Sequence, residues 1–232
     1  MKKSIAIVGG GASALMLASS LDTNKFDITI YERNFAPGRK FLVAGDGGFN
    51  LTHSEDASLL VNRYTPASFF LPLIKKFNNI DFQHWLENIS IPTYIGSSKR
   101  VFPKKGIKPV AVLNAILSLI AQRNIPIKTQ HLWKGWSPNN ELIFENQSNT
   151  IFIKPDITVF ALGGASWKIT GSDGNWVSHF KEKSITIIPF QASNCAYKID
   201  WPSSFIEVTE GKSLKNISLT CNTVKKKGEV LI

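Results

Sequence analysis

The sequence has very few cysteines. Only Cys195 and Cys221 occur in 232 residues, and they form no CxxC pair. This scarcity excludes a disulfide framework and a zinc site, and we expect two buried, reduced thiols. The histidines share no ligand spacing either, so we predict no metal site and treat each of them as structural: His53, His84, His131 and His179.

The sequence also lacks a second feature, an uninterrupted run of about 20 apolar residues. Its first residues, MKKSIAIVGGGASALMLASS, look like a signal peptide because two lysines precede an apolar stretch. Glycines interrupt that stretch, however, in a pattern that has another explanation. We therefore predict a cytoplasmic protein without a membrane span.

Acidic residues are scarce: 17 Asp and Glu face 27 Lys and Arg, which gives a formal charge of +10. An excess of this size attracts anions in general. The basic residues are scattered, without the aromatic interleaving of a nucleic-acid face, so we do not expect a nucleic-acid partner. A positive pocket for a phosphate-bearing ligand fits better. With 43% hydrophobic residues, the chain has the composition of a globular protein.

The N-terminal segment predicts a strand–helix–strand unit. Residues 4–8 are apolar and β-branched, residues 12–21 have helical spacing, and residues 28–32 alternate like a second strand. A connection that contains a helix places its two strands in parallel.

Between the first strand and the helix lies the pattern G-x-G-x-x-A, formed by Gly9, Gly11 and Ala14. In this pattern the first glycine permits a tight turn, the second leaves room for a pyrophosphate, and the small third residue lets the helix pack on the strand. Helix-start N–H groups, here those of Ala12 and Ser13, can meet phosphate oxygens. Glu32 ends the second strand at the spacing of a carboxylate that binds ribose hydroxyls. The segment predicts a dinucleotide site.

The remaining elements indicate an α/β fold with an insertion of strands. We expect helices at 66–77, 81–88 and 109–122, and a hairpin around Gly96 and Ser97. Three strands, 127–133, 141–146 and 150–154, are predicted to form an antiparallel meander. The apolar run 156–164 then suits a central strand of a parallel sheet.

The meander and a basic loop favour one dinucleotide, FAD. Two-dinucleotide-binding flavoproteins use a β-meander as the crossover before the strand that ends in glycines. The loop that carries Arg39 and Lys40 is longer than a simple NAD domain requires. We predict a Rossmann-like, two-dinucleotide-binding FAD domain over residues 1–188 and the start of a strand-rich second domain over residues 189–232.

Several stretches resemble one family. IVGGGASALMLA, YERNFAPGRKFLVAGDGGFNLTHSE, KRVFPKKGIKPVAVL, HLWKGW, ALGGASWKITGSDGNWV and PFQASNCAYKIDWPSSF are similar to the HI0933-like flavoproteins. The resemblance implies an FAD-dependent oxidoreductase, with NAD(P)H as donor and an unsaturated or carbonyl-conjugated small molecule as substrate. It assigns no catalytic residue, and the oligomeric state is unknown.

The resemblance also implies cofactor contacts. Arg39 and Lys40 would lie near the diphosphate or the flavin edge, and Arg33 would join Glu32. The other implied cofactor contacts are Asn50, Thr52, Leu132, Ala161, Gly163 and Gly164. Four residues either line the mouth of the flavin pocket or form a packed surface turn: Trp167, Thr170, Ser172 and Asp173.

Two departures from the family raise alternatives. Asp46 stands where members have glycine or a basic residue, and an acid there would repel a diphosphate. Members are also longer, so we expect this chain to bind the ADP half of FAD better than the isoalloxazine and to turn over poorly. A catalytically impaired or non-enzymatic flavin-binding remnant is therefore an alternative. An RNA-associated flavoprotein is the second.

Overall fold

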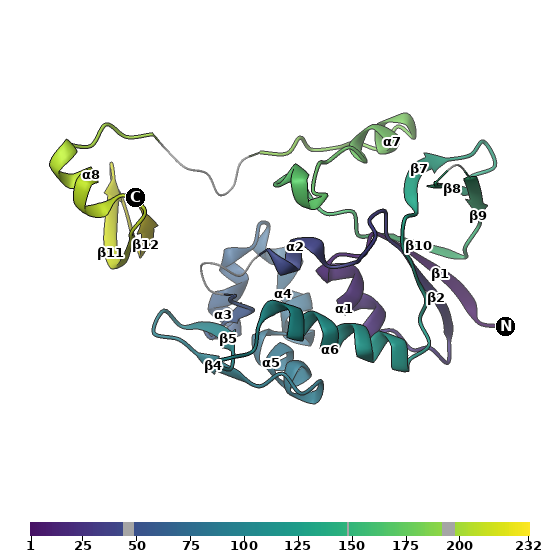
Figure 1. Ribbon diagram of the computed structural model, residues 1–232, viewed down its shortest axis with the longest axis horizontal. Coiled ribbons are helices and arrows are strands. Elements are labelled where there is room, and N and C mark those ends of the chain that lie inside the picture. Colours follow the sequence, from purple (N-terminus) through teal and green to yellow (C-terminus); the bar gives the residue numbers. More distant parts are fainter. Residues whose placement is uncertain (44–48, 148, 192–197) are drawn as a thin grey trace. The chain divides into compact units, whose positions relative to one another are not determined.

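The computed structural model describes residues 1–43, 49–147, 149–191 and 198–232. Contacts divide the chain into two units, Met1–Phe190 and Gln191–Ile232 (Figure 1). The first unit contains a parallel sheet, helices and two small antiparallel sheets. The second contains a helix and a hairpin. Asp46 and Cys195 lie outside the described residues.

The parallel sheet is built around the predicted strand–helix–strand unit. Its strands follow the order β10-β1-β2-β6 and all three pairings are parallel. Helix α1 (Ala12–Ser20) connects the two middle strands. The α/β class and the parallel start of the chain are thus confirmed. The strands are β1 (Lys3–Val8), β2 (Phe26–Tyr31), β6 (Ile127–Lys128) and β10 (Ile157–Phe160).

Alternating residues of β1 enter two different cores. Ile5 and Ile7 pack under the helices α1, α5 (Asn79–Asn88) and α6 (Pro109–Gln122), whereas Ala6 and Val8 pack under the aromatic residues of the other face. Because side chains of a strand alternate between faces, a fully buried strand must be apolar throughout. The sheet is therefore the middle layer of the first unit.

The second face is covered by an antiparallel sheet, the meander, of β7 (Leu132–Trp136), β8 (Leu142–Asn146) and β9 (Asn149–Ile153). Phe144 of β8 is fully buried and stacks on Tyr31 of β2 at 4.5 Å between ring centres. The predicted strand 127–133 is wrong as a single strand. Its first two residues form β6, which pairs with β2, and Gln130 turns the chain at φ +58° before the meander begins.

The apolar run 156–164 does not take a central position. Among the described residues its strand, β10, is one of the two edge strands of the four-stranded sheet, and Ile157 is 37% exposed. The prediction of a parallel strand is confirmed, but that of a central one is wrong. An apolar run alone does not show how many neighbours a strand has.

The segment between β2 and α6 forms a helical layer and a small sheet. Helix α5 begins with a capping box in which Asn78 and Asp81 accept each other's backbone N–H groups. The predicted hairpin is present as β4 and β5, and β3 pairs with β5. These elements are α2 (Arg39–Leu42), β3 (Thr52–His53), α3 (Ala57–Leu60), η1 (Val61–Arg63), α4 (Ala67–Lys76), β4 (Thr93–Ile95) and β5 (Arg100–Pro103); η2 (Lys168–Thr170) and α7 (Val177–Glu182) follow β10.

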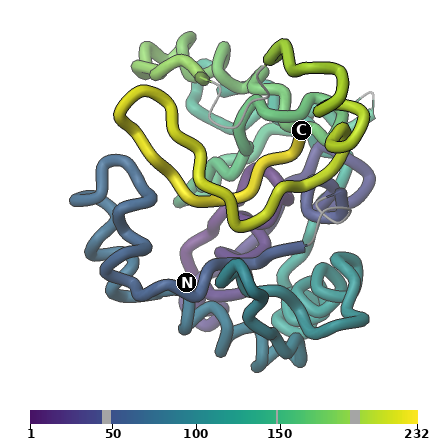
Figure 2. The backbone as a smooth tube through the Cα atoms, turned by 90° about the vertical axis from the view of Figure 1, so that its left-hand side faces the viewer, coloured from purple at the N-terminus to yellow at the C-terminus, as the bar shows by residue number. Residues whose placement is uncertain are grey.

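The second unit consists of α8 (Ser203–Thr209) and a hairpin of β11 (Ser213–Cys221) and β12 (Val224–Leu231), the yellow loop in Figure 2. The hairpin agrees with the predicted strand-rich character, whereas no helix was predicted in this segment. Cys221 is exposed, so the expectation of a buried thiol is wrong at this position. None of the helices in the described part of the chain is long and apolar enough to cross a membrane.

Candidate functional site

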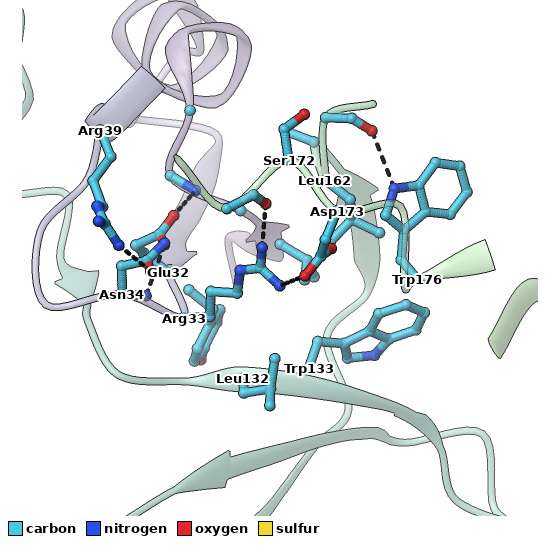
Figure 3. Close-up of a pocket in the computed structure, with 18 of the residues that line it drawn as sticks. Glu32, Arg33, Asn34, Arg39, Leu132, Trp133, Leu162, Ser172, Asp173 and Trp176 are labelled. Carbon is cyan, nitrogen blue, oxygen red and sulfur yellow. Dashed lines mark hydrogen bonds and ion pairs between the residues drawn. The ribbon is translucent and has the colours of Figure 1, made fainter. Parts of the chain in front are cut away.

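A pocket of about 320 Å³ lies where three parallel strands end (Figure 3). Residues 8–11 lie at the end of β1, residues 31–34 lie at the end of β2, and residues 161–163 directly follow β10. Parallel strands present their carboxyl ends at one edge, which is where ligands bind in open α/β sheets. The topology therefore brings three segments that are far apart in sequence to one site.

Each of the three glycines after β1 meets a different surrounding. Gly9 has φ +106°, and an added Cβ would lie 2.4 Å from the carbonyl oxygen of Ala161. At Gly10 a Cβ would lie 2.8 Å from Oε2 of Glu32. At Gly11, by contrast, a Cβ would meet no heavy atom of the described residues within 4 Å. Gly9 and Gly10 serve the close approach of neighbouring segments, and only Gly11 leaves open space toward the pocket.

Helix α1 presents its N-terminus to that space. Gly11 is the N-cap residue of α1. Among the described residues no side chain caps this end of the helix, and the first turn contains no acidic residue. The first N–H groups of a helix have no partner inside the helix, and the helix dipole makes this end positive. This arrangement suits an anion.

Glu32 forms part of the pocket wall, and only 7% of its surface is exposed. Its Oε2 accepts a hydrogen bond from the Gly10 N–H at 2.7 Å. Its Oε1 accepts from the backbone N–H and the side-chain Nδ2 of Asn34 at 2.8 and 2.6 Å. A carboxylate has about four acceptor positions. The three bonds orient Glu32 and leave it able to accept one more, such as a hydroxyl.

Two cations of helix α2 line the same pocket. Arg39 donates from Nη1 to Oδ1 of Asn34 at 3.1 Å, and Lys40 donates to Oγ of Ser166. Gly38, the N-cap of α2, has φ +73° and lies against Leu113 of α6. Helix α2 therefore begins directly after Gly38, and its first two side chains line the pocket.

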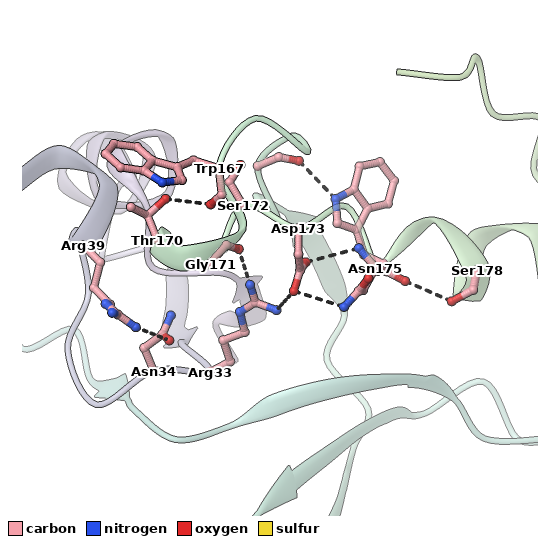
Figure 4. Close-up of polar contacts among 12 residues, drawn as sticks. Arg33, Asn34, Arg39, Trp167, Thr170, Gly171, Ser172, Asp173, Asn175 and Ser178 are labelled. Atoms are coloured by element: carbon pink, nitrogen blue, oxygen red, sulfur yellow. Dashed lines mark hydrogen bonds and ion pairs between the residues drawn. The ribbon is translucent and has the colours of Figure 1, made fainter. Parts of the chain in front are cut away.

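A segment after β10, here called the strap (residues 165–176), lies along the pocket (Figure 4). Arg33 binds it twice: Nη1 lies 2.9 Å from Oδ2 of Asp173, and Nη2 donates to the carbonyl oxygen of Gly171. Ser172 Oγ donates to the Gly164 carbonyl oxygen at 3.0 Å. The strap is therefore fixed to the ends of both β2 and β10.

The charge of Asp173 is stabilised by this arrangement. Burial raises the pKa of Asp173, but hydrogen bonds from Arg33 and from the Asn175 backbone, with the Arg33 charge, lower it more. The net pKa lies below the ordinary value of an aspartate. Asp173 is thus ionised at neutral pH and remains paired with Arg33.

Most of the residues predicted from the sequence line this pocket: Gly9, Gly11, Glu32, Arg33, Arg39, Lys40, Leu132, Ala161, Gly163, Thr170, Ser172 and Asp173. Their contacts with a ligand stay predictions. The other predicted residues are not among those that line it: Ala12, Ser13, Ala14, Asn50, Thr52, Gly164 and Trp167.

The residues outside the pocket have identifiable places. Ala14 is completely buried, which fits its role in helix–strand packing, while Ala12 and Ser13 lie exposed at the start of α1. Asn50 is exposed, and Thr52 pairs with Val101 in the small sheet.

The sequence reasoning missed several residues of the pocket. Gly10 and Asn34, which orient Glu32, line it, and so does Trp176, whose Nε1 donates to the Gly163 carbonyl oxygen at 3.1 Å. Asn34 follows Glu32 by two residues, a spacing at which a side chain can return to its neighbour. Trp176 had no such signal. Among the described residues no cluster of His, Cys, Asp and Glu is placed to hold a metal ion.

Solved structures show the same fold at low sequence identity. THI4 from Thermovibrio ammonificans is 16% identical, with a TM-score of 0.51 over 79% of this chain and 63% of its own. A 3-ketosteroid-Δ4-(5α)-dehydrogenase from Rhodococcus jostii is 8% identical, with a TM-score of 0.53 over 70% and 46%. A flavocytochrome c3 fumarate reductase is 14% identical, with a TM-score of 0.58 over 78% and 40%. This chain spans less than two thirds of each.

No curated protein matches the chain. One family does: the HI0933-like protein Rossmann domain matches residues 3–229. The match includes the glycine turn, Glu32 and the strap, which together form the pocket. The chain therefore belongs to the HI0933-like family and has a Rossmann-like α/β fold.

Proposed function

We propose that the pocket binds FAD through its ADP half and that the chain is part of an FAD-dependent oxidoreductase. The observation that carries this proposal is the meeting of Gly11, Glu32 and the N-terminus of α1 at the ends of β1 and β2. The family membership supports it. The flavocytochrome fumarate reductase, which has a similar fold, supports it as well.

The residues of the pocket fit an adenosine diphosphate group. The open space at Gly11 and the first N–H groups of α1 would hold the diphosphate. The remaining acceptor position of Glu32 would bind a ribose hydroxyl. Arg39 and Lys40 would add positive charge near the phosphates.

Bound FAD would supply two-electron transfer, for which side chains alone have no equivalent. NAD(P)H is the proposed electron donor, and an unsaturated or carbonyl-conjugated small molecule is the proposed substrate. The chain's own residues bind and orient: the carboxylate of Glu32 is held by three hydrogen bonds, and the strap covers part of the pocket through Arg33 and Asp173. The described pocket provides for the ADP half in particular.

The test is ligand binding by the purified protein. Absorbance at about 450 nm reports bound flavin, and calorimetry with FAD, ADP and riboflavin 5′-phosphate shows which half is recognised. We expect ADP to bind and to compete with FAD, and riboflavin 5′-phosphate to bind weakly. Gly11→Val should abolish binding of both FAD and ADP, because its side chain fills the open space. Equal FAD content in Gly11→Val and the parent protein would refute the proposal.

Reduction by NADH and by NADPH, followed by stopped-flow absorbance, tests the oxidoreductase part separately. If the protein binds FAD but neither nucleotide reduces the bound flavin, the FAD site is retained and NAD(P)H is excluded as the electron donor.

A further inference from the structure

Helix α4 (Ala67–Lys76) is apolar but poorly covered. Ile74 is its only buried residue, whereas Phe69 is 63% and Leu73 50% exposed. These two residues are one turn apart, and Phe77, at the C-cap, follows one turn later and is 45% exposed. Residues spaced in this way share one face of a helix. We call Phe69, Leu73 and Phe77 the α4 stripe.

The exposure of the α4 stripe is unusual for a helix of this composition. A surface helix normally turns its apolar residues toward the core. In α4 the buried side is narrow, and large apolar side chains point away from it. Contiguous exposed apolar residues mark sites of contact with another protein or with a membrane.

The charged residues of the segment 57–80, which contains the stripe, are all of one sign. Between Asp56 and Asp81 the sequence has no acidic residue. Lys75 and Lys76 lie exposed in the last turn of α4. The third basic residue of this segment, Arg63, is already paired with Glu55. The helix thus presents apolar and cationic groups together, which is the composition of helices that lie in a membrane interface.

We propose that α4 docks on an anionic lipid surface, with the α4 stripe inserted among the acyl chains, Lys76 on the headgroups beside it, and Lys75 on the outer side of the helix, where its charge adds to the attraction. A lipid surface offers both an apolar layer and negative charge. A second copy of the chain is disfavoured, because a symmetric contact through this face would bring the same lysines together. The inference uses no residue of the pocket and does not depend on the proposed function.

The experiment is flotation of the full chain with lipid vesicles. We expect binding to vesicles of phosphatidylcholine and phosphatidylglycerol to exceed binding to phosphatidylcholine alone severalfold. It should fall as salt is added, because salt screens the lysines. The double variant Phe69→Ser, Leu73→Ser should lose at least about fivefold in bound fraction. Phe152→Ser is the matched control, since Phe152 is a 54% exposed phenylalanine on β9.

A second variant, Lys75→Glu with Lys76→Glu, tests the same docking if circular dichroism shows that the serine variant is unfolded. We expect it to fold and to lose binding to anionic vesicles. Equal binding of the parent to both vesicle types, or undiminished binding of the lysine variant, would overturn the proposal. A third outcome would also overturn it: the parent protein binds no vesicles, is a dimer in light scattering, and becomes a monomer when the serine substitutions are introduced. In that case the stripe would bind a second copy of the chain.

Discussion

The guanidinium of Arg33 and the carboxylate of Asp173 form an ion pair of 2.9 Å between residues 140 positions apart. Arg33 directly follows Glu32 at the end of β2, and Asp173 lies in the strap. Both side chains are mostly buried, with exposed fractions of 28% and 13%. The pair therefore connects the position of the strap to the strand end that carries Glu32.

Loss of this pair should destabilise the first unit. Asp173→Asn removes the charge that faces Arg33 but keeps the shape of the side chain. We expect the free energy of unfolding at pH 7 to fall by about 1–3 kcal/mol, the usual range for hydrogen bonds to charged groups. Urea denaturation followed by tryptophan fluorescence measures it. Glu145→Gln is the control, because its pair with Lys134 is half exposed and should contribute at most about 1 kcal/mol.

The effect of Asp173→Asn should depend on pH. The pKa of Asp173 in the folded protein lies below its ordinary value, so the folded state favours the ionised form. This contribution is present above the unfolded pKa of about 3.9 and is lost as pH falls through the folded pKa. Parent and variant should therefore approach equal stability as the pH is lowered below about 4. A difference that stays constant down to pH values of about 3 would show that the charge of Asp173 is not responsible.

The first and third glycines of the turn should respond differently to alanine. Gly9→Ala places a Cβ 2.4 Å from the Ala161 oxygen at φ +106°, and we expect a loss of at least about 2 kcal/mol in the free energy of unfolding. Gly11→Ala has open space and φ −79°, and its loss should stay below about 1 kcal/mol. Thermal unfolding of both variants checks this. Similar losses would mean that Gly11 also has a structural role.

The N-terminal half of the site was predictable from local sequence. The glycine turn, the helix and Glu32 lie within 32 residues, and each belongs to a pattern with a fixed spacing. The local sequence did not show, however, why position 9 must be a glycine. Gly9 is required by Ala161, a residue 152 positions later that directly follows β10. Such a requirement belongs to the pairing of β1 with β10 and has no local signal.

The errors in the strands have a similar origin. Residues 127–133 were predicted as one strand, but Ile127 pairs with Ile30 in the parallel sheet and Trp133 with Phe144 in the meander. Propensity describes a segment and not its partner. The strap shows the same limit: the family resemblance left Asp173 either at the mouth of the pocket or in a packed surface turn, and its pairing with Arg33 required the folded arrangement.

Arg123 should contribute to stability far from the pocket. It follows α6, and its Nη1 and Nη2 donate to the carbonyl oxygens of Ser19 and Leu21 at the end of α1. The last carbonyl groups of a helix need such donors. Arg123→Ala should lower the free energy of unfolding by about 1–3 kcal/mol, and Arg123→Lys by less, since one ammonium replaces the two-pronged guanidinium. Urea denaturation that finds both variants as stable as the parent would contradict this role.

The decisive change at the pocket wall is Glu32→Gln. A glutamine has one acceptor oxygen, so it cannot accept from both Gly10 and Asn34, and its NH₂ group must face one of these donors. The side chain then loses the orientation that leaves an acceptor position for a ribose hydroxyl. We expect calorimetry to show ADP affinity lowered by about tenfold or more, corresponding to about 1.4 kcal/mol. Asn34→Ala is the comparison: of the three hydrogen bonds to Glu32 it removes only the one from Nδ2, together with the Arg39 contact to Asn34 Oδ1, and it leaves both carboxylate oxygens in place. If Glu32→Gln bound ADP as well as the parent did, the carboxylate would serve the glycine turn alone and the ribose contact would have to come from another residue.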